Sequence, residues 1–411
     1  MFKKLISTPI SIRLGSVFWG FVSSVLINRI LGLAVRGEYT TITTYANLLQ
    51  TAVNLGLCFA YAPMMKKYGK EVAKHNISLL IWLQALLYAV IFACIGVSCQ
   101  QYDISAMLML GWLQILNNQV VFLSLIDDIR FRNKVLLLSA FVYAIVNIGQ
   151  MVLGFRELHL VIAILCGKTL LEAVICAVHS RLLILDRQLF DKTAILDTLR
   201  YGVPTALLAT LILLNYNVDV YVLNYFHASS VQVGIYGVAY SLANMLWFIP
   251  DAFKELVYNK SARGNAARET VVLVMVNICI CAVICIGFAI FGEAFLGIMY
   301  GDEYRVAFPT VMTVFIGILP MVAFKLIHPI YVNEGKSLIV IGLLSVSVAA
   351  NIVMACFLVP LYAAFGAALA TVGSYTVCGL LFSMKFLKDY QLKISTGFSD
   401  CRALMHRYMK G

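Results

Sequence analysis

Charged residues are scarce in this sequence. Only 12% of its 411 residues are Asp, Glu, Lys or Arg, whereas 62% are hydrophobic. Soluble globular proteins carry about 25% charged residues, and no segment here is long and polar enough to form a soluble domain. The shortage of charge and the repeated apolar runs predict an all-α polytopic membrane protein.

Metal-binding and nucleotide-binding motifs are also missing. The eleven cysteines and six histidines are dispersed, and none of them shows the spacing of a metal site. No GxxxxGK[ST] loop occurs, so the sequence gives no sign of an ATP-driven step. We therefore expect neither a metal ion nor another cofactor.

About twelve apolar runs are long enough to cross a bilayer, which takes about 20 helical residues each. Pro360 and Gly366 divide the last long run into two helices. We expect the spans at 12–33, 39–62, 77–98, 104–126, 134–154, 158–185, 198–226, 231–257, 270–299, 306–333, 337–359 and 364–387.

The basic residues are distributed unevenly over the expected connections. If the N-terminus is cytoplasmic, 25 of the 31 Lys and Arg fall in inside loops or at the termini. Outside loops hold only Arg36, Arg156 and Arg305. This asymmetry is what the positive-inside rule expects. The net charge of +11 is thus explained by membrane topology with both termini cytoplasmic, and nucleic acid is not an expected partner.

Three cations, Lys168, Lys325 and Arg29, lie within the expected spans. A lone charge at the bilayer centre costs about 3 kcal/mol on insertion scales, so such residues usually face protein or water and bind a partner. We expect these three to bind an anionic group. Lys168 and Glu172 share one helix face at i and i+4, so the alternative for Lys168 is a purely structural pair. For Arg29 and Lys325, nearer to helix ends, the alternative is snorkelling.

Other polar residues within spans suggest ion coupling. Asp219 lies several residues inside its helix, where a carboxylate can accept a proton or a sodium ion. Glu172 and His328 are further candidates, and the alternative for Asp219 is a hydrogen bond to a nearby Asn or Tyr. Pro320 in mid-span removes a backbone hydrogen bond and is a candidate hinge.

Several short runs resemble bacterial polysaccharide flippases, the Wzx family of the MATE-like (MOP) exporter superfamily. The start of that family is similar to NRILGLAVRGEY, from Asn28 to Tyr39, followed by Asn54-Leu-Gly56 and Ala62-Pro63. The start of its second half is similar to Asp219-Val-Tyr-Val-Leu, Val233-Gly-Ile-Tyr236 and Ile249-Pro250. Its penultimate outside turn is similar to Leu358–Thr371, except that Ala363 stands where glycine is common.

The resemblance implies two six-helix lobes, here 1–192 and 193–411 with a short cytoplasmic tail, around a central cavity. It implies that the protein flips an undecaprenyl-diphosphate-linked oligosaccharide across the inner membrane for O-antigen or related polysaccharide synthesis. A polysaccharide polymerase and a chain-length regulator are then expected partners. An anion moving outward gains about 2.3 kcal/mol per charge per 100 mV, so we expect flipping to be driven by the membrane potential, or by exchange of H⁺ or Na⁺ at Asp219.

Two other readings stay open. One is a MATE-like small-molecule or drug:cation antiporter, although three interior cations favour an anionic cargo. The other is a membrane polysaccharide polymerase or ligase. Such an enzyme normally needs a large outer loop to carry its site, and every expected outside connection is short. We therefore expect a transporter and not an enzyme.

Overall fold

The computed structural model describes residues 9–182, 187–261 and 267–392. Across these ranges the regular structure is helical, with no strand. By its contacts the chain divides into two compact units, Met1–Leu213 (unit 1) and Leu214–Gly411 (unit 2). The division falls inside one long helix, whereas the boundary expected from the sequence lies between residues 192 and 193. The assignment of six helices to each lobe stays a prediction.

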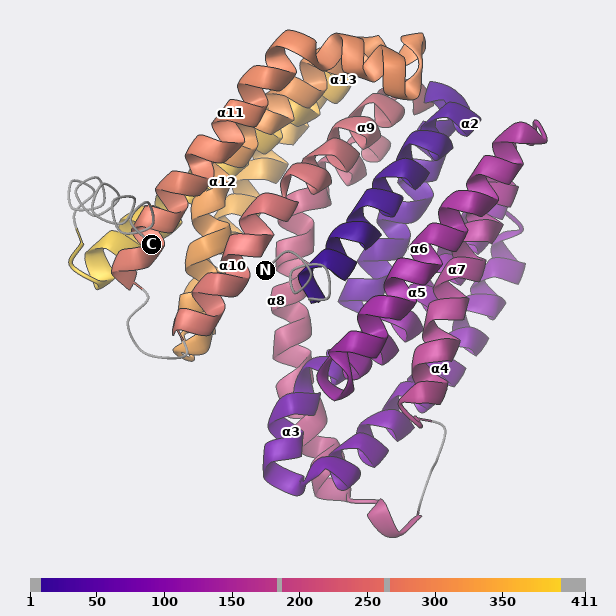
Figure 1. Ribbon diagram of the computed structural model, residues 1–411, viewed down its shortest axis with the longest axis vertical. Helices are drawn as coiled ribbons and strands as arrows, with labels where there is room; N and C mark the ends of the chain where they lie inside the picture. Colours follow the sequence, from indigo (N-terminus) through magenta and orange to yellow (C-terminus); the bar gives the residue numbers. More distant parts are fainter. Residues whose placement is uncertain (1–8, 183–186, 262–266, 393–411) are drawn as a thin grey trace. The chain divides into compact units, whose positions relative to one another are not determined.

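Unit 1 is a bundle of long helices (Figure 1). Helix α2 packs against α5 and α6, while α5 also packs against α4 and α7. Its elements are α2 (Pro9–Ala52), η1 (Leu57–Ala60), α3 (Tyr61–Tyr68), α4 (Lys70–Cys99), α5 (Tyr102–Asp127), α6 (Ile129–Val152), α7 (Leu158–His179), η2 (Arg187–Leu189) and the first part of α8 (Lys192–Tyr225).

A single glycine divides α2 into two spanning segments. Its 44 residues would measure about 66 Å as one straight helix, about twice the 30 Å of the bilayer core. Gly32 interrupts it with φ 67° and ψ 170°, a conformation that residues with a Cβ rarely adopt. The expected outer loop between the first two spans is therefore absent, and Arg36 lies in the second segment.

The second segment of α2 ends at Ala52, earlier than the expected residue 62. Leu55 and Gly56 both have positive φ, 60° and 63°, and they turn the chain into η1. A Cβ on Gly56 would lie 2.1 Å from the carbonyl oxygen of Gly202 on α8. The motif Asn54-Leu-Gly56 thus forms a tight backbone contact that only glycine permits.

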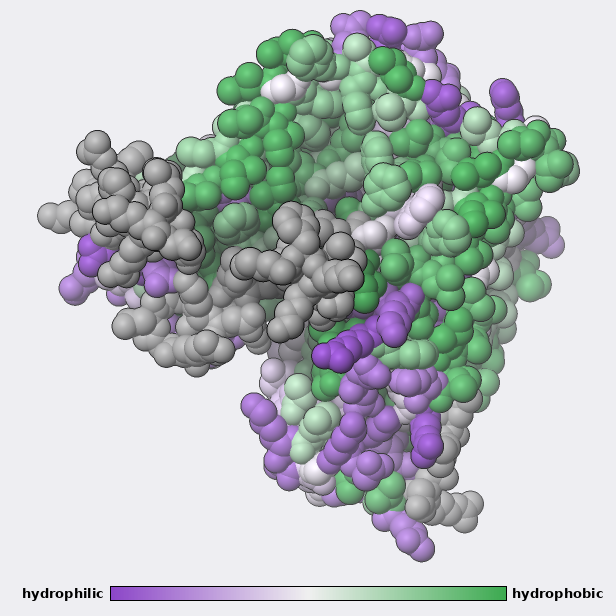
Figure 2. Space-filling view, in the orientation of Figure 1, coloured by the Kyte–Doolittle hydropathy of each residue, from purple (hydrophilic) through white to green (hydrophobic). Residues whose placement is uncertain are grey.

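One end of unit 1 is hydrophilic. Figure 2 shows polar side chains gathered over α3 and the start of α4, where Lys66, Lys67 and Lys70 are exposed. At this end Asp128 caps α6, because its Oδ1 accepts the backbone N–H groups of Arg130 (3.1 Å) and Phe131 (3.0 Å). The N–H of Phe131, more than that of Arg130, holds the pKa of Asp128 below its ordinary value, so the cap is charged at neutral pH.

Unit 2 is built around α12. This helix packs against α13, α11, α10 and α9. The elements after α8 are α9 (Ser230–Leu246), α10 (Phe248–Ser261), α11 (Ala267–Tyr300), η3 (Asp302–Ala307), α12 (Phe308–Asn333) and α13 (Ser337–Asp389).

Helix α13 also consists of two segments. Its 53 residues are interrupted at Ala363, which has φ 46° and ψ −122°. This region is favourable for glycine and strained for alanine. Immediately afterwards, a Cβ on Gly366 would lie 2.2 Å from the carbonyl oxygen of Leu358, so the two segments approach closely at this turn.

Ten helical stretches in the described residues are long and apolar enough to cross a membrane. Two of them, in α2 and α13, are each divided by the breaks at Gly32 and Ala363, which gives twelve helical segments, the number expected from the sequence. The sequence-based fold class, an all-α multi-pass membrane protein, is confirmed. Several boundaries differ: α7 ends at His179, not at residue 185, and α8 begins at Lys192, not at residue 198.

Candidate functional site

Lys168 and Glu172 form an ion pair on α7, as their spacing predicts. Lys168 Nζ lies 3.0 Å from Glu172 Oε1. Lys168 is 10 residues from the start of α7 and 11 from its end, so it lies midway along the span. Its side chain is 27% exposed, whereas that of Glu172 is only 4% exposed. The cation is therefore the accessible partner, and the carboxylate is its buried counter-ion.

Glu172 is fixed from two neighbouring helices. Its Oε2 accepts a hydrogen bond from Asn117 Nδ2 on α5 (3.1 Å), and its Oε1 accepts one from Ser139 Oγ on α6. A buried carboxylate is stable only when its oxygens are bonded in this way. The network therefore holds the counter-ion in place from two neighbouring helices.

Tyr143 of α6 borders Lys168, with the ammonium nitrogen 5.8 Å from its ring centre. In the same unit Arg36 is only 6% exposed, and its guanidinium lies 4.8 Å from the ring centre of Tyr39. The sequence-based placement of Arg36 in an outer loop was wrong, because Gly32 alone makes the turn. Arg36 is therefore a further interior cation of unit 1, whereas Arg29, on the first segment of α2, is exposed.

Lys325 of α12 is paired in unit 2. Its Nζ lies 2.9 Å from Asp251 Oδ1 on α10, and it faces the ring centres of Trp247 at 4.7 Å and Tyr216 at 5.4 Å. Lys254 Nζ forms a second, longer ion pair with Asp251 Oδ1 at 3.6 Å. Lys325 is thus held between a carboxylate and two aromatic faces, an arrangement that stabilises a cation. Asp251 was not singled out from the sequence, although it lies inside the expected span 231–257.

His328 lies one turn after Lys325 and bonds to its own helix. Its Nδ1 is 3.0 Å from the carbonyl oxygen of Phe324, and its ring stacks on that of Phe324 with centres 4.6 Å apart. Its part in ion coupling stays a prediction.

Asp219 of α8 is completely buried in unit 2. Its Oδ2 accepts hydrogen bonds from Tyr236 Oη on α9 (2.9 Å) and Asn351 Nδ2 on α13 (3.3 Å). Tyr236 Oη is also 2.8 Å from Thr371 Oγ1. In the described residues Asp219 Oδ1 has no hydrogen-bond partner. The alternative considered for Asp219, a hydrogen bond to an Asn or Tyr, is thus present, while one carboxylate oxygen has no hydrogen-bond partner in the described residues.

A second polar contact lies one turn earlier on the same two helices. Asn215 Oδ1 accepts a hydrogen bond from Ser347 Oγ at 2.7 Å. Asn215 and Asp219 are spaced i, i+4 on α8, and so are Ser347 and Asn351 on α13, so both pairs lie on facing sides of their helices. This polar seam joins α8 to α13 inside otherwise apolar packing.

Pro320 lies at a close contact between α12 and α13. A Cβ on Gly379 would come within 2.1 Å of the carbonyl oxygen of Pro320, so the two backbones touch there. Helix α12 is assigned as continuous from Phe308 to Asn333, with Pro320 and Pro329 inside it. The proposed bending at Pro320 stays a prediction.

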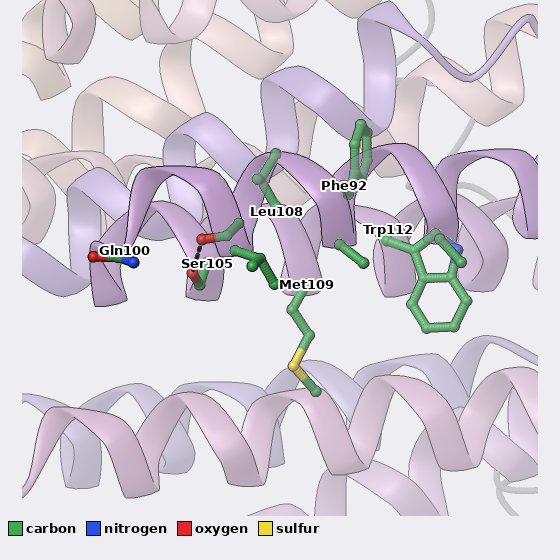
Figure 3. Close-up of a pocket in the computed structure, with 10 residues that line it drawn as sticks. Phe92, Gln100, Ser105, Leu108, Met109 and Trp112 are labelled. Carbon is green, nitrogen blue, oxygen red and sulfur yellow. Dashed lines mark hydrogen bonds between the residues drawn. The ribbon is translucent and has the colours of Figure 1, made fainter.

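An apolar groove of about 670 Å³ runs between α4 and α5 of unit 1. Figure 3 shows Phe92, Leu108, Met109 and Trp112 along it, with Gln100 and Ser105 toward one end. No charged residue lines this groove, so it suits an apolar chain and not a phosphate. No three His, Cys, Asp or Glu side chains in the described ranges are placed to hold a metal ion.

Comparison with known proteins gives the same architecture. Similar solved structures include an inward-facing multidrug resistance MATE family transporter of the MOP superfamily (12% identity, TM-score 0.69, covering 93% of this chain and 96% of that one). Others are the lipid II flippase MurJ in an inward closed conformation (12%, 0.73, 95% and 90%) and the eukaryotic MATE transporter AtDTX14 (16%, 0.57, 98% and 98%). At these identities the likeness concerns the fold alone.

No curated protein matches the sequence. The family model described as "Polysaccharide biosynthesis protein" matches residues 6–249, more than half of the chain, and the expected resemblance is confirmed. Together with the ten apolar stretches and the MATE-like fold, this match identifies the chain as a multi-pass membrane protein that belongs to the polysaccharide biosynthesis protein family.

Proposed function

We propose that this protein flips an undecaprenyl-diphosphate-linked oligosaccharide from the cytoplasmic to the periplasmic leaflet of the bacterial inner membrane. The product serves O-antigen or related surface polysaccharide synthesis, and transport proceeds by alternating access. Membership of the polysaccharide biosynthesis protein family and the fold shared with a lipid II flippase support this proposal. Both termini are cytoplasmic, and a polymerase and a chain-length regulator act on the flipped product.

One observation carries the proposal: an accessible lysine with a buried counter-ion lies midway along a span. A diphosphate approaching Lys168 meets a side chain that is 27% exposed. It can accept an ammonium hydrogen bond, while Glu172 keeps its bonds to Asn117 and Ser139. Charge-assisted hydrogen bonds to phosphate are the strong ones. Lys325 and Arg29 supply further positive charge to the cargo.

Coupling is assigned to Asp219, with Glu172 and His328 as secondary candidates. The free oxygen of Asp219 lies in a fully buried polar seam, where binding or losing a positive charge changes the local interactions most. We assign the hinge to Pro320, where the carbonyl of a helix-interior proline meets Gly379. The energy comes from the membrane potential or from exchange of H⁺ or Na⁺.

Reconstitution tests the proposal. The purified protein is placed in vesicles with a fluorescent undecaprenyl-diphosphate-linked sugar, and the fraction protected from an external quencher is followed in time. We expect flipping to be faster than in vesicles without protein and to slow when the membrane potential and the H⁺ and Na⁺ gradients are collapsed. No acceleration by the protein, with its folding verified, would refute the flippase assignment.

The second candidate is a MATE-like small-molecule or drug:cation antiporter, which the fold favours. The same vesicles distinguish it, because cationic dye efflux would then depend on the gradient while the lipid-linked sugar would not move. A polymerase or ligase is less well supported. The connection from α4 to α5 is only Gln100 and Gln101, and that from α6 to α7 is residues 153–157, which leaves little chain to carry a catalytic site.

A further inference from the structure

A separate basic cavity lies at the hydrophilic end of unit 1. It has a volume of about 390 Å³ and is lined by Lys70, Lys74 and Arg181, together with Glu71, His75 and Ser78. Arg181 comes two residues after the end of α7, and Lys168 lies about 16 Å back along that helix. The cavity is therefore distinct from the Lys168 site.

The walls of this cavity are fixed by hydrogen bonds. Lys70, Lys74 and Ser78 recur every fourth residue on one face of α4. The opposite wall carries Arg181 and Leu189. It is attached to α4, because the backbone carbonyl of Leu182 accepts hydrogen bonds from Ser78 Oγ and from Trp82 Nε1 (2.9 Å).

A second set of bonds joins Asn76 to the same wall. Asn76 Nδ2 donates to the carbonyl of Leu189 (2.8 Å), and Asn76 Oδ1 accepts the backbone N–H of Asp191 (3.0 Å). Because α4 is bonded to Leu182, Leu189 and Asp191, the described lining of the cavity is a built feature of the fold.

The cavity carries an excess of positive charge. Asp127 on α5 forms ion pairs with two lysines: Lys70 Nζ lies 2.9 Å from its Oδ1 and Lys74 Nζ lies 2.8 Å from its Oδ2. One carboxylate thus holds two ammonium groups in place. Glu71 adds a second carboxylate. In the part of the chain that the structure describes, no carboxylate pairs with Arg181. Among the described residues three cations thus face two anions, and Arg181 is the cation without a paired carboxylate.

The cavity also lies at the border between polar and apolar surface. Just beyond Ser78 along α4, Leu83 and Leu86 are 55% and 67% exposed, as expected for side chains that face lipid. Trp82 stands at this border, the depth that tryptophan prefers in membrane proteins. A ligand in the cavity therefore has its charged group at the level of lipid headgroups and a hydrocarbon surface next to it.

We propose that this cavity binds the phosphate of an anionic membrane lipid, whose acyl chains run along the exposed face of α4. Basic pockets beside spans on the cytoplasmic side are suited to anionic headgroups. The inference does not depend on the flippase activity, since a resident lipid would bind whether or not the protein transports a glycolipid. The lipid proposal is tested by a binding measurement and the flippase proposal by transport in vesicles, so either one can be refuted without the other.

The test uses the full-length protein in detergent, titrated with phosphatidylglycerol or phosphatidylcholine and followed by native mass spectrometry. We expect phosphatidylglycerol to bind more tightly than phosphatidylcholine. Each cation removed should weaken it about fivefold, the usual effect of one basic residue near a membrane surface. Arg181→Gln should therefore bind about fivefold more weakly, and Arg181→Gln with Lys70→Gln about 25-fold. The matched control is Arg200→Gln, an arginine of unit 1 that is 79% exposed and does not line the cavity, which should change binding less than twofold.

Three results would overturn the proposal: equal affinity for both lipids, no effect of Arg181→Gln, or the same loss in Arg200→Gln. Inorganic phosphate is the competitor that distinguishes the ligand source. If it displaces phosphatidylglycerol at equal concentration, the site binds soluble phosphate and the lipid assignment is wrong. Thermal midpoints verify folding, and should Lys70→Gln unfold, Arg181→Gln decides alone because Arg181 has no ion-pair partner in the described residues.

Discussion

The positive charge of Lys168 is already balanced by Glu172 at 3.0 Å. In the proposed mechanism an anionic cargo therefore competes with a resident carboxylate, and binding would leave the buried Glu172 to rely on Asn117 and Ser139. Such an exchange would make the proposed site selective for anions, since a neutral ligand gains nothing by displacing a charged partner.

Replacing Lys168 tests this role. Lys168→Ala removes a charge-assisted bond, which contributes about 1.5–3 kcal/mol, so flipping in vesicles should fall roughly 10- to 100-fold. Lys168→Arg keeps the charge and should retain part of the activity. Lys192→Ala, an exposed lysine of the same unit, is the control and should behave like the wild type. Normal flipping by Lys168→Ala, with membrane insertion verified by fractionation, would exclude the residue from the mechanism.

Asp219→Asn tests coupling with little change of shape. The amide oxygen can still accept the bond from Tyr236, but the site can no longer carry a negative charge. We expect the H⁺ or Na⁺ dependence of flipping to disappear, while the thermal midpoint shifts only slightly. Asp302→Asn, at a carboxylate that is 87% exposed, should keep the dependence. A gradient response that survives in Asp219→Asn would assign coupling elsewhere.

The sequence revealed some of these residues and concealed others. Lys168, Glu172, Lys325 and Asp219 stand out because each interrupts a long apolar run. Arg36 was misplaced, since its neighbours Gly37 and Glu38 suggest a loop and nothing in the sequence says that Gly32 alone can turn the chain. The partners that α5, α6 and α13 bring to the carboxylates depend on helix packing, which one sequence does not specify.

At the scale of helices, the crossing of α12 and α13 depends on one missing side chain. A methyl group at Gly379 would lie 2.1 Å from the carbonyl oxygen of Pro320, and a backbone oxygen cannot rotate away. Gly342, in the first segment of α13, has nothing within 4 Å of such a position. The two glycines therefore differ in packing although both are helical.

Alanine at these two positions should act in opposite directions. Gly379→Ala must separate the helices and should lower the free energy of unfolding by about 1–3 kcal/mol, as overpacking does. Gly342→Ala should leave it unchanged or raise it slightly, since alanine favours a helix. Thermal or denaturant unfolding in detergent measures both. Equal effects of the two substitutions would contradict the close crossing.

The turn within α13 offers a stabilising substitution. Ala363 has φ 46°, so Ala363→Gly should relieve backbone strain and raise the free energy of unfolding by about 1 kcal/mol. Ala367→Gly, at a fully buried helical position four residues later, should lower it, since glycine loses more entropy in a helix. The sequence had flagged Ala363 as a departure from the family pattern, but only the backbone angles give that departure an energetic meaning.

Helix number was predictable because the thickness of the bilayer fixes the length of a span. The residues at which the helices end were less predictable from the sequence. The second segment of α2 stops at Ala52 through the positive φ of Leu55 and Gly56, whereas the apolar sequence continues to residue 62. Hydrophobicity reports the depth at which a residue lies and says little about where the backbone turns.

For the whole molecule, the charge pattern predicts an orientation that reporters can verify. A periplasm-active phosphatase fused after Phe155, between α6 and α7, should be active, whereas a fusion after Lys192 should be inactive. A cytoplasm-active reporter should give the opposite result at each site. Phosphatase activity at Lys192 alone would show that the orientation is the reverse of the assigned one. Activity at both sites would contradict the assigned topology.

Gly32 and Ala363 each reverse the chain with almost no connecting residues. Such junctions offer a protease too little extended peptide to cut and give an antibody scarcely any epitope. With both turns on the periplasmic side, as proposed, protease added to spheroplasts should therefore not cut at these two positions, and an inserted tag would have to displace the turn itself.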